Sequence, residues 1–130
     1  MGKPVRFFLF PCNQFAFQEP HANSVIKSFA EKYLNLGSGS SVVMFAKSNV
    51  NGPCSSDKGC QPSSTACCQA NNPIYSYLES VVPGKCDWNF NKFPVGSDGV
   101  PTKRYPDNVY ASDLEKDIDA LLSGADTTVV

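Results

Sequence analysis

The residues best suited to chemistry lie in one polar turn, FPCNQFAFQEP, from Phe10 to Pro20. The turn follows an apolar run, Val5 to Phe10, and contains Cys12 together with two side-chain amides four residues apart, Gln14 and Gln18. Amides donate and accept hydrogen bonds without carrying charge, so they can hold a reactive anion without a counter-charge. The alternative is a polar turn whose amides cap its own backbone, and the residue types leave both interpretations open.

An α/β arrangement of elements would position that turn. Val5 to Phe10 is predicted as a strand buried on both faces, because nearly every position is apolar. A proline ends the run, and loops at the carboxyl ends of strands are where chemistry sits in α/β proteins. A helix is predicted over residues 24–34 with Asn23 as its N-cap. A second strand is predicted over residues 41–46, after a turn that begins at Gly37.

The second half of the chain predicts two helices and a hairpin. One helix opens at Asn72-Pro73, with proline at its first position. Segments 89–95 and 100–105 flank a Ser-Asp-Gly turn and predict a hairpin. Ser112 and Glu115 form a capping box before the last helix. The apolar residues expected to face inward are Ile74, Tyr77, Leu78 and Val81 on the first helix and Leu114, Ile118, Leu121 and Leu122 on the last. Pattern alone therefore indicates an α/β protein with a mixed sheet.

Composition and charge limit the classes of protein that fit. The chain has 130 residues, which predicts one domain over residues 1–130, and 42% of them are hydrophobic, enough for a core. The net charge of −1, from 11 basic and 12 acidic residues, argues against a nucleic-acid surface. No apolar run approaches the roughly 20 residues that span a bilayer, and the run near the start is too short for a signal peptide. We therefore expect a cytoplasmic protein with no nucleic-acid partner and no membrane span.

Two long motifs carry a resemblance to a known family. The turn FPCNQFAFQEP is followed downstream by WNFNKF at residues 88–93, then by Asp98-Gly99 and Lys103-Arg104-Tyr105. In this order they resemble the glutathione peroxidases, and weaker matches lie at residues 50–52 and 113–122. The resemblance implies the family's thioredoxin-like fold. That fold has three layers, α/β/α, with a mixed central sheet, and here it would lack its opening strand and first helix.

The resemblance implies thiol-dependent reduction of hydrogen peroxide or of organic and lipid hydroperoxides. In the family, a thiolate or selenolate attacks the peroxide and is oxidised, and thiols restore it. The groups that stabilise this anion match Gln18, Trp88 and Asn89, whose amide and indole N–H groups all donate. We expect the three side chains to converge on one spot. As the only tryptophan, Trp88 could also be a plain core aromatic, but its WNF context favours the site.

The resemblance implies glutathione or thioredoxin as the reducing co-substrate, and no further cofactor or metal. Thioredoxin-using members carry a second, resolving cysteine at the position that matches Glu31. Its absence there favours direct reduction by glutathione or a resolving cysteine from elsewhere in the chain. His21 stands where the family commonly has glycine, and it is assigned no role.

The chain departs from the family at its start. The family's reactive cysteine or selenocysteine lies in a segment before the strand that ends in FPCNQF, and this chain begins at Met1, close to that strand. The loss would leave the strand with an unpaired edge. Three explanations are open: a gene model that starts too late, as would result if a selenocysteine codon were read as a stop; a fragment or alternative product; and a natural inactive relative. The first two are favoured because three site residues are retained. The alternative function is a catalytically inactive thioredoxin-like fragment or binding module.

The cysteines need an interpretation of their own. Cys12 and Cys86 are the possible redox residues, although Cys12 is more simply a small buried residue. Cys86 is the better substitute nucleophile because it neighbours Trp88. A Cys-rich insertion at about residues 52–71 contains Cys54, Cys60, Cys67 and Cys68. It is predicted to be an irregular surface loop with disulfides or exposed thiols rather than zinc, because its spacings give no paired C-x2-C arms. The tail from Gly124 is expected to fray.

Overall fold

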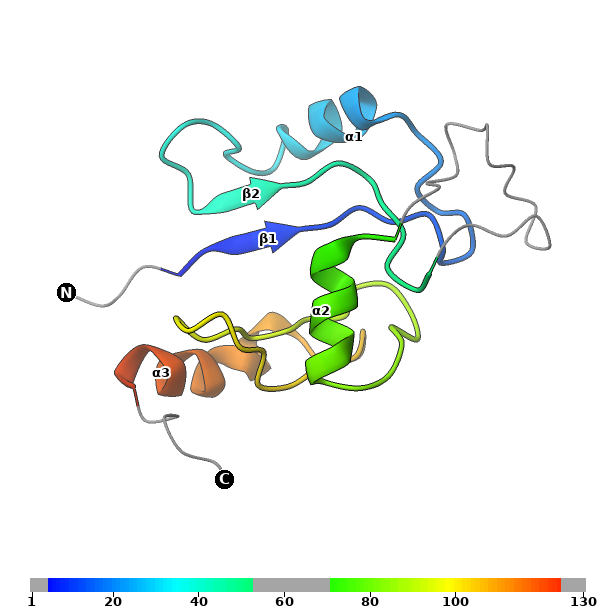
Figure 1. Cartoon of the computed structure of the whole chain (residues 1–130). Coiled ribbons are helices and arrows are strands. Elements are labelled where there is room, and N and C mark those ends of the chain that lie inside the picture. The colour runs from blue at the N-terminus through cyan, green and yellow to red at the C-terminus, as the bar shows by residue number, and fades with distance from the viewer. Residues whose placement is uncertain (1–4, 53–70, 125–130) are drawn as a thin grey trace. The chain divides into compact units, whose positions relative to one another are not determined.

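The computed structural model describes residues 5–52 and 71–124 of the chain (Figure 1). The elements are β1 (Phe7–Leu9), α1 (Asn23–Ala30), β2 (Val42–Met44), α2 (Pro73–Val81), the 3-10 helix η2 (Ala111–Leu114) and α3 (Glu115–Ser123). The chain divides into two compact units between Pro73 and Ile74. We call them the N-terminal unit and the C-terminal unit and describe each by itself. The prediction of one domain over residues 1–130 stays a prediction.

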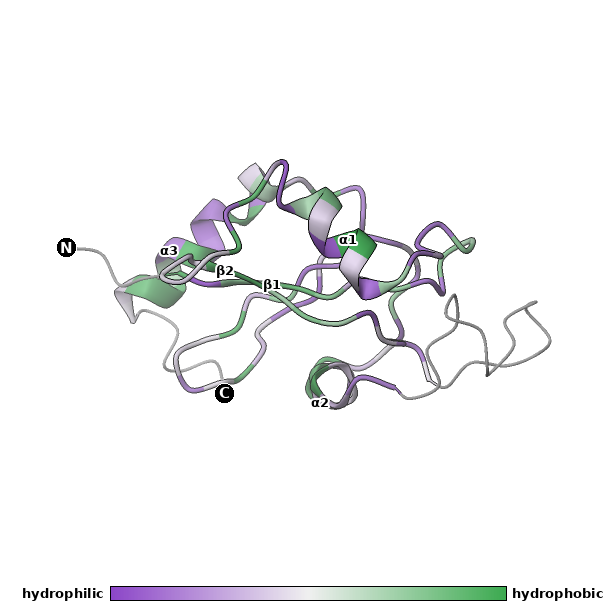
Figure 2. Ribbon diagram, turned by 90° about the horizontal axis from the view of Figure 1, so that it is seen from above, coloured by the Kyte–Doolittle hydropathy of each residue, from purple (hydrophilic) through white to green (hydrophobic). Residues whose placement is uncertain are grey.

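The N-terminal unit contains a parallel pair of strands joined through α1. β1 and β2 pair in register, with Phe7 opposite Val42 and Leu9 opposite Met44. Figure 1 shows α1 beside the strands, and Figure 2 shows both strands coloured as hydrophobic. The ring of Phe45 extends the apolar surface because it stacks on Phe10 at 4.4 Å between centroids. Two parallel strands connected by a helix form the unit from which α/β sheets are built.

The burial predicted for β1 is wrong, although its position along the chain is right. Phe7 and Phe8 are 50% and 52% exposed, so the strand is not covered on both faces by the described residues. The reason is topological, because among those residues β1 pairs with β2 alone. Both strands are also shorter than the predicted segments.

Helix α1 begins one residue earlier than predicted, and Asn23 is not its N-cap. Ala22 occupies the capping position, without a side-chain hydrogen bond. The side chain of Asn23 accepts the backbone N–H of Lys47 at 2.8 Å instead. A long-range contact therefore takes the oxygen that local propensity assigns to the cap. The helix buries Ile26 and Ala30 against the rest of the unit.

Helix α2 begins at Pro73, which confirms the prediction, and from Ile74 onward it belongs to the C-terminal unit. Its predicted inner face is only partly buried: Leu78 is 7% exposed, whereas Tyr77 and Val81 are 46% and 41% exposed. Tyr77 is amphipathic, and its hydroxyl donates to the carbonyl of Gly99 at 3.2 Å. That contact explains why Tyr77 stays near the surface.

The predicted hairpin is present as two antiparallel bridges, Lys92 with Tyr105 and Val95 with Pro101. Lys92 and Tyr105 exchange backbone hydrogen bonds of 3.0 and 2.8 Å. The turn between the bridges requires glycine at one position, because Gly99 has a φ of 83°. The regular strands expected here are therefore shortened to isolated pairs.

The last helix is capped differently from the prediction. The Asp113 carboxylate, rather than Glu115, accepts the backbone N–H three residues before it, that of Tyr110, at 3.0 Å. The capping pair is shifted because η2 precedes α3 and begins the helical turn earlier. Of the predicted apolar stripe, Leu114 is buried, and Ile118, Leu121 and Leu122 are half-buried. Gly124 ends α3 with a left-handed conformation, φ 73°.

Two predictions lie outside the described residues. The insertion at about residues 52–71 falls almost wholly in residues 53–70, with Cys54, Cys60, Cys67 and Cys68, and the frayed tail falls in residues 125–130. Within the described ranges, no helix is both long enough and apolar enough to cross a membrane.

Candidate functional site

The polar turn at residues 13–19 is built by one buried amide. Asn13 is 3% exposed, and its side-chain oxygen accepts the backbone N–H of Glu19 at 3.0 Å. The chain between them bends through Ala16 and Phe17, which have φ angles of 51° and 55°. Two consecutive non-glycine residues in the left-handed region are costly, so the closure across Asn13 must hold them there. The bend presents Gln18 as an exposed residue.

Gln14 performs a structural task that its sequence context did not predict. Its side-chain oxygen accepts the N–H groups of Val50 and Asn51 at 2.8 and 2.9 Å. Its side-chain nitrogen donates to the carbonyl of Gly52 at 2.9 Å. The amide of Gln14 therefore holds the turn at residues 50–52 against the polar turn at residues 13–19. The side-chain amide of Gln14 therefore caps backbone groups, as one of the two interpretations expected, but these groups lie 36 to 38 residues further along the chain.

Cys12 lies beside this clamp rather than at a helix start. Its sulfur accepts the N–H of Gln14 at 3.4 Å, and its thiol lies 3.6 Å from the side-chain oxygen of the same residue. Cys12 is half-buried. These contacts tie the thiol to the turn, which agrees better with the packing interpretation than with a reactive thiolate.

A second device that sequence reasoning missed is the ammonium group of Lys47. It donates to the carbonyls of Glu19 and His21 at 3.2 and 2.7 Å. The segment after Gln18 is thereby anchored to the end of β2. His21 takes part through its backbone carbonyl, and its side chain still has no assigned role. A lysine in a turn carries no local signal for such a contact, because its partners lie more than 20 residues away.

In the C-terminal unit, Trp88 and Asn89 lie in a turn closed by Asp87 and Asn91. One oxygen of Asp87 accepts the N–H of Trp88 at 3.1 Å and the amide of Asn91 at 3.2 Å. The same amide donates to the carbonyl of Trp88 at 2.7 Å. The pKa of Asp87 is lowered, mainly by the hydrogen bond from Asn91. Trp88 is 40% exposed, which argues against a plain core aromatic.

Cys86 is the most buried described cysteine, at 4% exposure. Both its backbone N–H and its thiol donate to the carboxylate of Glu79 on α2. Burial raises the pKa of Glu79, although these hydrogen bonds and the charge of Arg104 oppose the rise. A thiol that donates to a carboxylate is disfavoured as a thiolate, because two negative charges would then adjoin. This environment weakens the hypothesis that Cys86 replaces the missing nucleophile.

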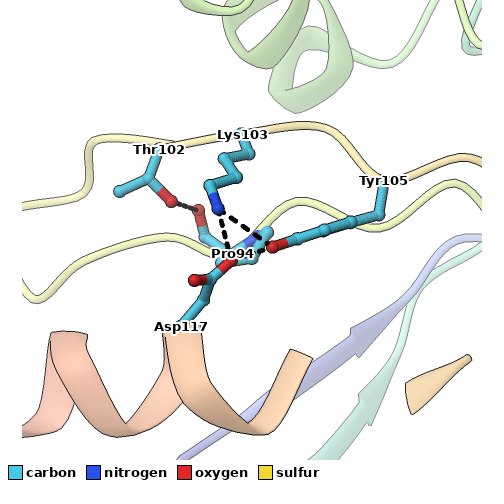
Figure 3. Close-up of polar contacts among 5 residues, drawn as sticks. All are labelled: Pro94, Thr102, Lys103, Tyr105 and Asp117. Carbon is cyan, nitrogen blue, oxygen red and sulfur yellow. Dashed lines mark hydrogen bonds and ion pairs between the residues drawn. The ribbon is translucent and has the colours of Figure 1, made fainter. Parts of the chain in front are cut away.

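A polar cluster fixes the second arm of the hairpin, residues 100–105, to α3 (Figure 3). Lys103 pairs with Asp117 at 2.8 Å, and the hydroxyl of Tyr105 donates to the same carboxylate oxygen. The lysine nitrogen also lies 3.2 Å from that hydroxyl. On the first arm of the hairpin, the carbonyl of Pro94 accepts the hydroxyl of Thr102 at 3.4 Å. The extended segment is therefore held on both sides.

The three predicted site residues are distributed over the two units. Trp88 and Asn89 are adjacent in one turn of the C-terminal unit, whereas Gln18 belongs to the N-terminal unit. The expected convergence of all three stays a prediction. The described non-glycine residues with positive φ all adjoin these three: Ala16 and Phe17 precede Gln18, and Phe90 follows Asn89. Backbone strain of this kind gathers at functional sites.

Among the described residues, no group of three His, Cys, Asp or Glu side chains could hold a metal ion.

Comparison with known proteins gives three informative relatives. No family model matches the chain. Phospholipid hydroperoxide glutathione peroxidase 1, chloroplastic, of Arabidopsis thaliana is 39% identical over 118 residues, covering 88% of this chain and 42% of the relative. Glutathione peroxidase of Schistosoma mansoni is 37% identical over 127 residues, 94% of this chain and 63% of the relative. Glutathione peroxidase 1 of Rattus norvegicus is 37% identical, over 88% of this chain and 61% of the relative.

One solved structure, described as "Crystal structure of Trgpx in apo form", has a TM-score of 0.51 and 20% identity to the chain. The match covers 89% of this chain and 78% of that one. At this identity the likeness shows the fold alone, which confirms the predicted thioredoxin-like class. The sequence matches, at 34–39% identity over most of the chain, place it in the glutathione peroxidase family. The chain spans roughly half the length of these curated relatives, between 42% and 63%.

Proposed function

We propose that this chain is part of a glutathione peroxidase-type oxidoreductase that reduces hydroperoxides with thiols. The observation that carries the proposal is the sequence identity of 34–39% to proteins named glutathione peroxidase. The retained Gln18, Trp88 and Asn89 support it, because the two described turns hold all three near strained backbone. The substrates proposed are hydrogen peroxide and organic or lipid hydroperoxides. The names of the Arabidopsis thaliana and Pisum sativum relatives specify phospholipid hydroperoxides.

The proposed reaction begins when a cysteine thiolate or selenocysteine selenolate attacks the distal oxygen of the peroxide. A bond from sulfur or selenium to oxygen forms as the O–O bond breaks, and the departing alkoxide takes a proton to become an alcohol or water. The chalcogen is oxidised by two electrons. A first thiol then displaces water from it, and a second thiol releases the original anion with formation of a disulfide. The proposed reductant is glutathione, with thioredoxin as the other candidate.

Gln18, Trp88 and Asn89 would act by stabilising the anion before it attacks. Each supplies an N–H donor, and a hydrogen bond to the charged form lowers the pKa of a thiol. None of the three can attack a peroxide itself, so the nucleophile must come from a segment outside the matched residues. Cys12 and Cys86 are poor substitutes, given their contacts with Gln14 and Glu79. We therefore expect little turnover from these 130 residues alone.

The test compares the chain with an extended protein that carries an opening segment from a relative, including its reactive cysteine. Glutathione-dependent peroxide consumption should appear in the extended protein. Within it, Gln18→Ala or Trp88→Phe should lower turnover about tenfold or more, as expected from one charge-assisted hydrogen bond of about 1.5–3 kcal/mol. Trp88→Phe keeps the aromatic packing and removes only the N–H, so it controls for lost volume.

Two outcomes would overturn the assignment. An extended, folded protein without turnover would favour the alternative, a catalytically inactive thioredoxin-like binding module. Strong turnover by the unextended chain would mean that one of its own sulfurs reacts, and Cys86→Ser would then show whether Cys86 is that sulfur. The proposed compartment is the cytoplasm. Two relatives are named chloroplastic, so the location of a tagged, complete protein should be observed directly.

A further inference from the structure

Arg104 stands at the meeting point of three segments of the C-terminal unit. One guanidinium nitrogen donates to the carbonyl of Lys85 at 2.7 Å. The charge of Arg104 also acts on two carboxylates: it opposes the rise in the pKa of Glu79 on α2 that burial causes, and it adds to the lowering of the pKa of Asp87, which the hydrogen bond from Asn91 mainly causes. A planar group with several donors suits such a junction better than an ammonium does.

The backbone at Gly84 is shaped to admit this guanidinium. Gly84 has a φ of 115°, a conformation that side chains rarely adopt. A Cβ atom placed there would lie 2.6 Å from one guanidinium nitrogen and 3.0 Å from the other. Any larger residue would therefore strain the backbone and push Arg104 away. The bend at Gly84-Lys85 and the side chain of Arg104 fit as a pair.

The bend leads directly into the turn that carries Trp88 and Asn89. Asp87, one of the carboxylates beside Arg104, is the residue whose oxygen accepts the N–H of Trp88 and the amide of Asn91. The hydrogen bond from Asn91 is the main cause of the lowered pKa of Asp87 and the charge of Arg104 adds to it, and an ionised carboxylate is the stronger acceptor. The charge of Arg104 thus acts on the group that closes the turn.

Arg104 is itself held in place by its neighbours in sequence. Side chains alternate along extended backbone, so Lys103 and Tyr105 point away from Arg104. Both bind Asp117 of α3 (Figure 3). The backbone of Tyr105 also pairs with that of Lys92. Residues 103–105 are thus fixed to α3 on one side, and the side chain of Arg104 points to the opposite side, toward the Gly84-Lys85 bend.

We propose that Arg104 is a positioning residue that sets the orientation of Trp88 and Asn89. It acts through the Gly84-Lys85 bend and the Asp87 carboxylate, without touching the reacting atoms. The consequence for catalysis rests on the proposed function, but the effect on the turn does not.

The decisive measurement uses the fluorescence of Trp88, the only tryptophan in the chain. In the 130-residue protein, Arg104→Gln should raise the acrylamide quenching constant of Trp88, with far-UV circular dichroism unchanged. Trp88 is 40% exposed, so complete exposure sets an upper limit of about 2.5-fold. Gly84→Ala should raise quenching as well, because the added Cβ displaces the guanidinium. Lys116→Gln is the matched control, since it removes an exposed cation of the same unit that takes no part in holding the segment of Arg104, and quenching should stay unchanged.

Quenching that stays the same in both Arg104→Gln and Gly84→Ala would overturn the proposal. If Arg104→Gln does not fold, Arg104→Lys and Gly84→Ala provide the same test. Arg104→Lys should raise the quenching constant of Trp88 less than Arg104→Gln would, because it keeps the charge. In the extended protein, Arg104→Gln should lower kcat between roughly tenfold and a hundredfold, as expected for a misplaced catalytic group. Increased quenching in a protein whose extended form has no turnover would refute the peroxidase assignment while leaving the positioning role intact.

Discussion

Replacing Gln14 by leucine tests whether one amide holds two distant segments of the N-terminal unit together. The change keeps a similar volume and removes the bonds to Val50, Asn51 and Gly52. Each is worth about 1 kcal/mol net, so the expected loss in the free energy of unfolding is about 3 kcal/mol. The N–H of Val50 contributes most, because Val50 is 2% exposed and water does not replace the lost acceptor.

Hydrogen exchange at individual amides is the assay that isolates this effect. A local loss of about 3 kcal/mol should speed exchange at Val50 and Asn51 about a hundredfold, because each 1.4 kcal/mol is a factor of about ten. Urea unfolding followed by far-UV circular dichroism gives the accompanying change in stability. Tryptophan emission is unsuitable here, because Trp88 belongs to the other unit.

Gln14→Glu is the matched control, because it keeps the acceptor oxygen and removes the donor. Protection at Val50 and Asn51 should survive in large part, while the bond to the carbonyl of Gly52 is lost. Unchanged exchange at both amides in a folded Gln14→Leu protein would refute the clamp. Equal losses in the two variants would show that the acceptor oxygen is not what holds the turn.

Two further changes test the strain and the charge described above. Ala16→Gly should raise the free energy of unfolding by about 1 kcal/mol, because glycine adopts the φ of 51° without penalty; the opposite result is expected for Ala30→Gly inside α1, and thermal unfolding measures both. As the pH rises from 4 to 7, the free energy of unfolding of Glu79→Gln should increase relative to that of the unchanged chain. Urea unfolding at both pH values measures this difference. The sign follows from the raised pKa of Glu79, since the folded chain binds this proton more tightly than the unfolded chain. That contribution is fully present below the unfolded pKa and is lost as the pH rises through the folded pKa, so a difference that moves the other way would contradict the burial of this carboxylate.

Sequence patterns located the elements well because local signals define them. Pro73 at the first helical position and the glycine turn at Gly99 acted as predicted, because each fixes the backbone by its own geometry. Predictions that depended on competition between partners were less successful. Two capping predictions show this: Asn23, the predicted N-cap, accepts the N–H of Lys47 instead, and Asp113 takes the capping role predicted for Glu115.

The candidate site shows the same division. Trp88 and Asn89 are adjacent in the sequence and therefore fall in one turn, in which Trp88 is exposed and Asn89 is half-buried. The tasks of Gln14 and Arg104 could not be predicted, because their partners lie 36 to 38 and 19 residues away. No spacing rule covers such pairs. Pro83-Gly84 is a local turn signal, but it does not show which side chain approaches the glycine.

The turn at residues 50–52 also influences how the chain ages chemically. Asn51 precedes Gly52, and an asparagine before glycine loses its amide when the following backbone nitrogen attacks the side-chain carbonyl to form a succinimide. That nitrogen is occupied here, since the N–H of Gly52 donates to the side chain of Asn71 at 2.9 Å. Formation of the ring would require this bond to break and the turn to rotate. The hydrogen bonds that shape the turn therefore also protect Asn51 from conversion to aspartate. Any change that weakens these bonds should also speed the deamidation of Asn51.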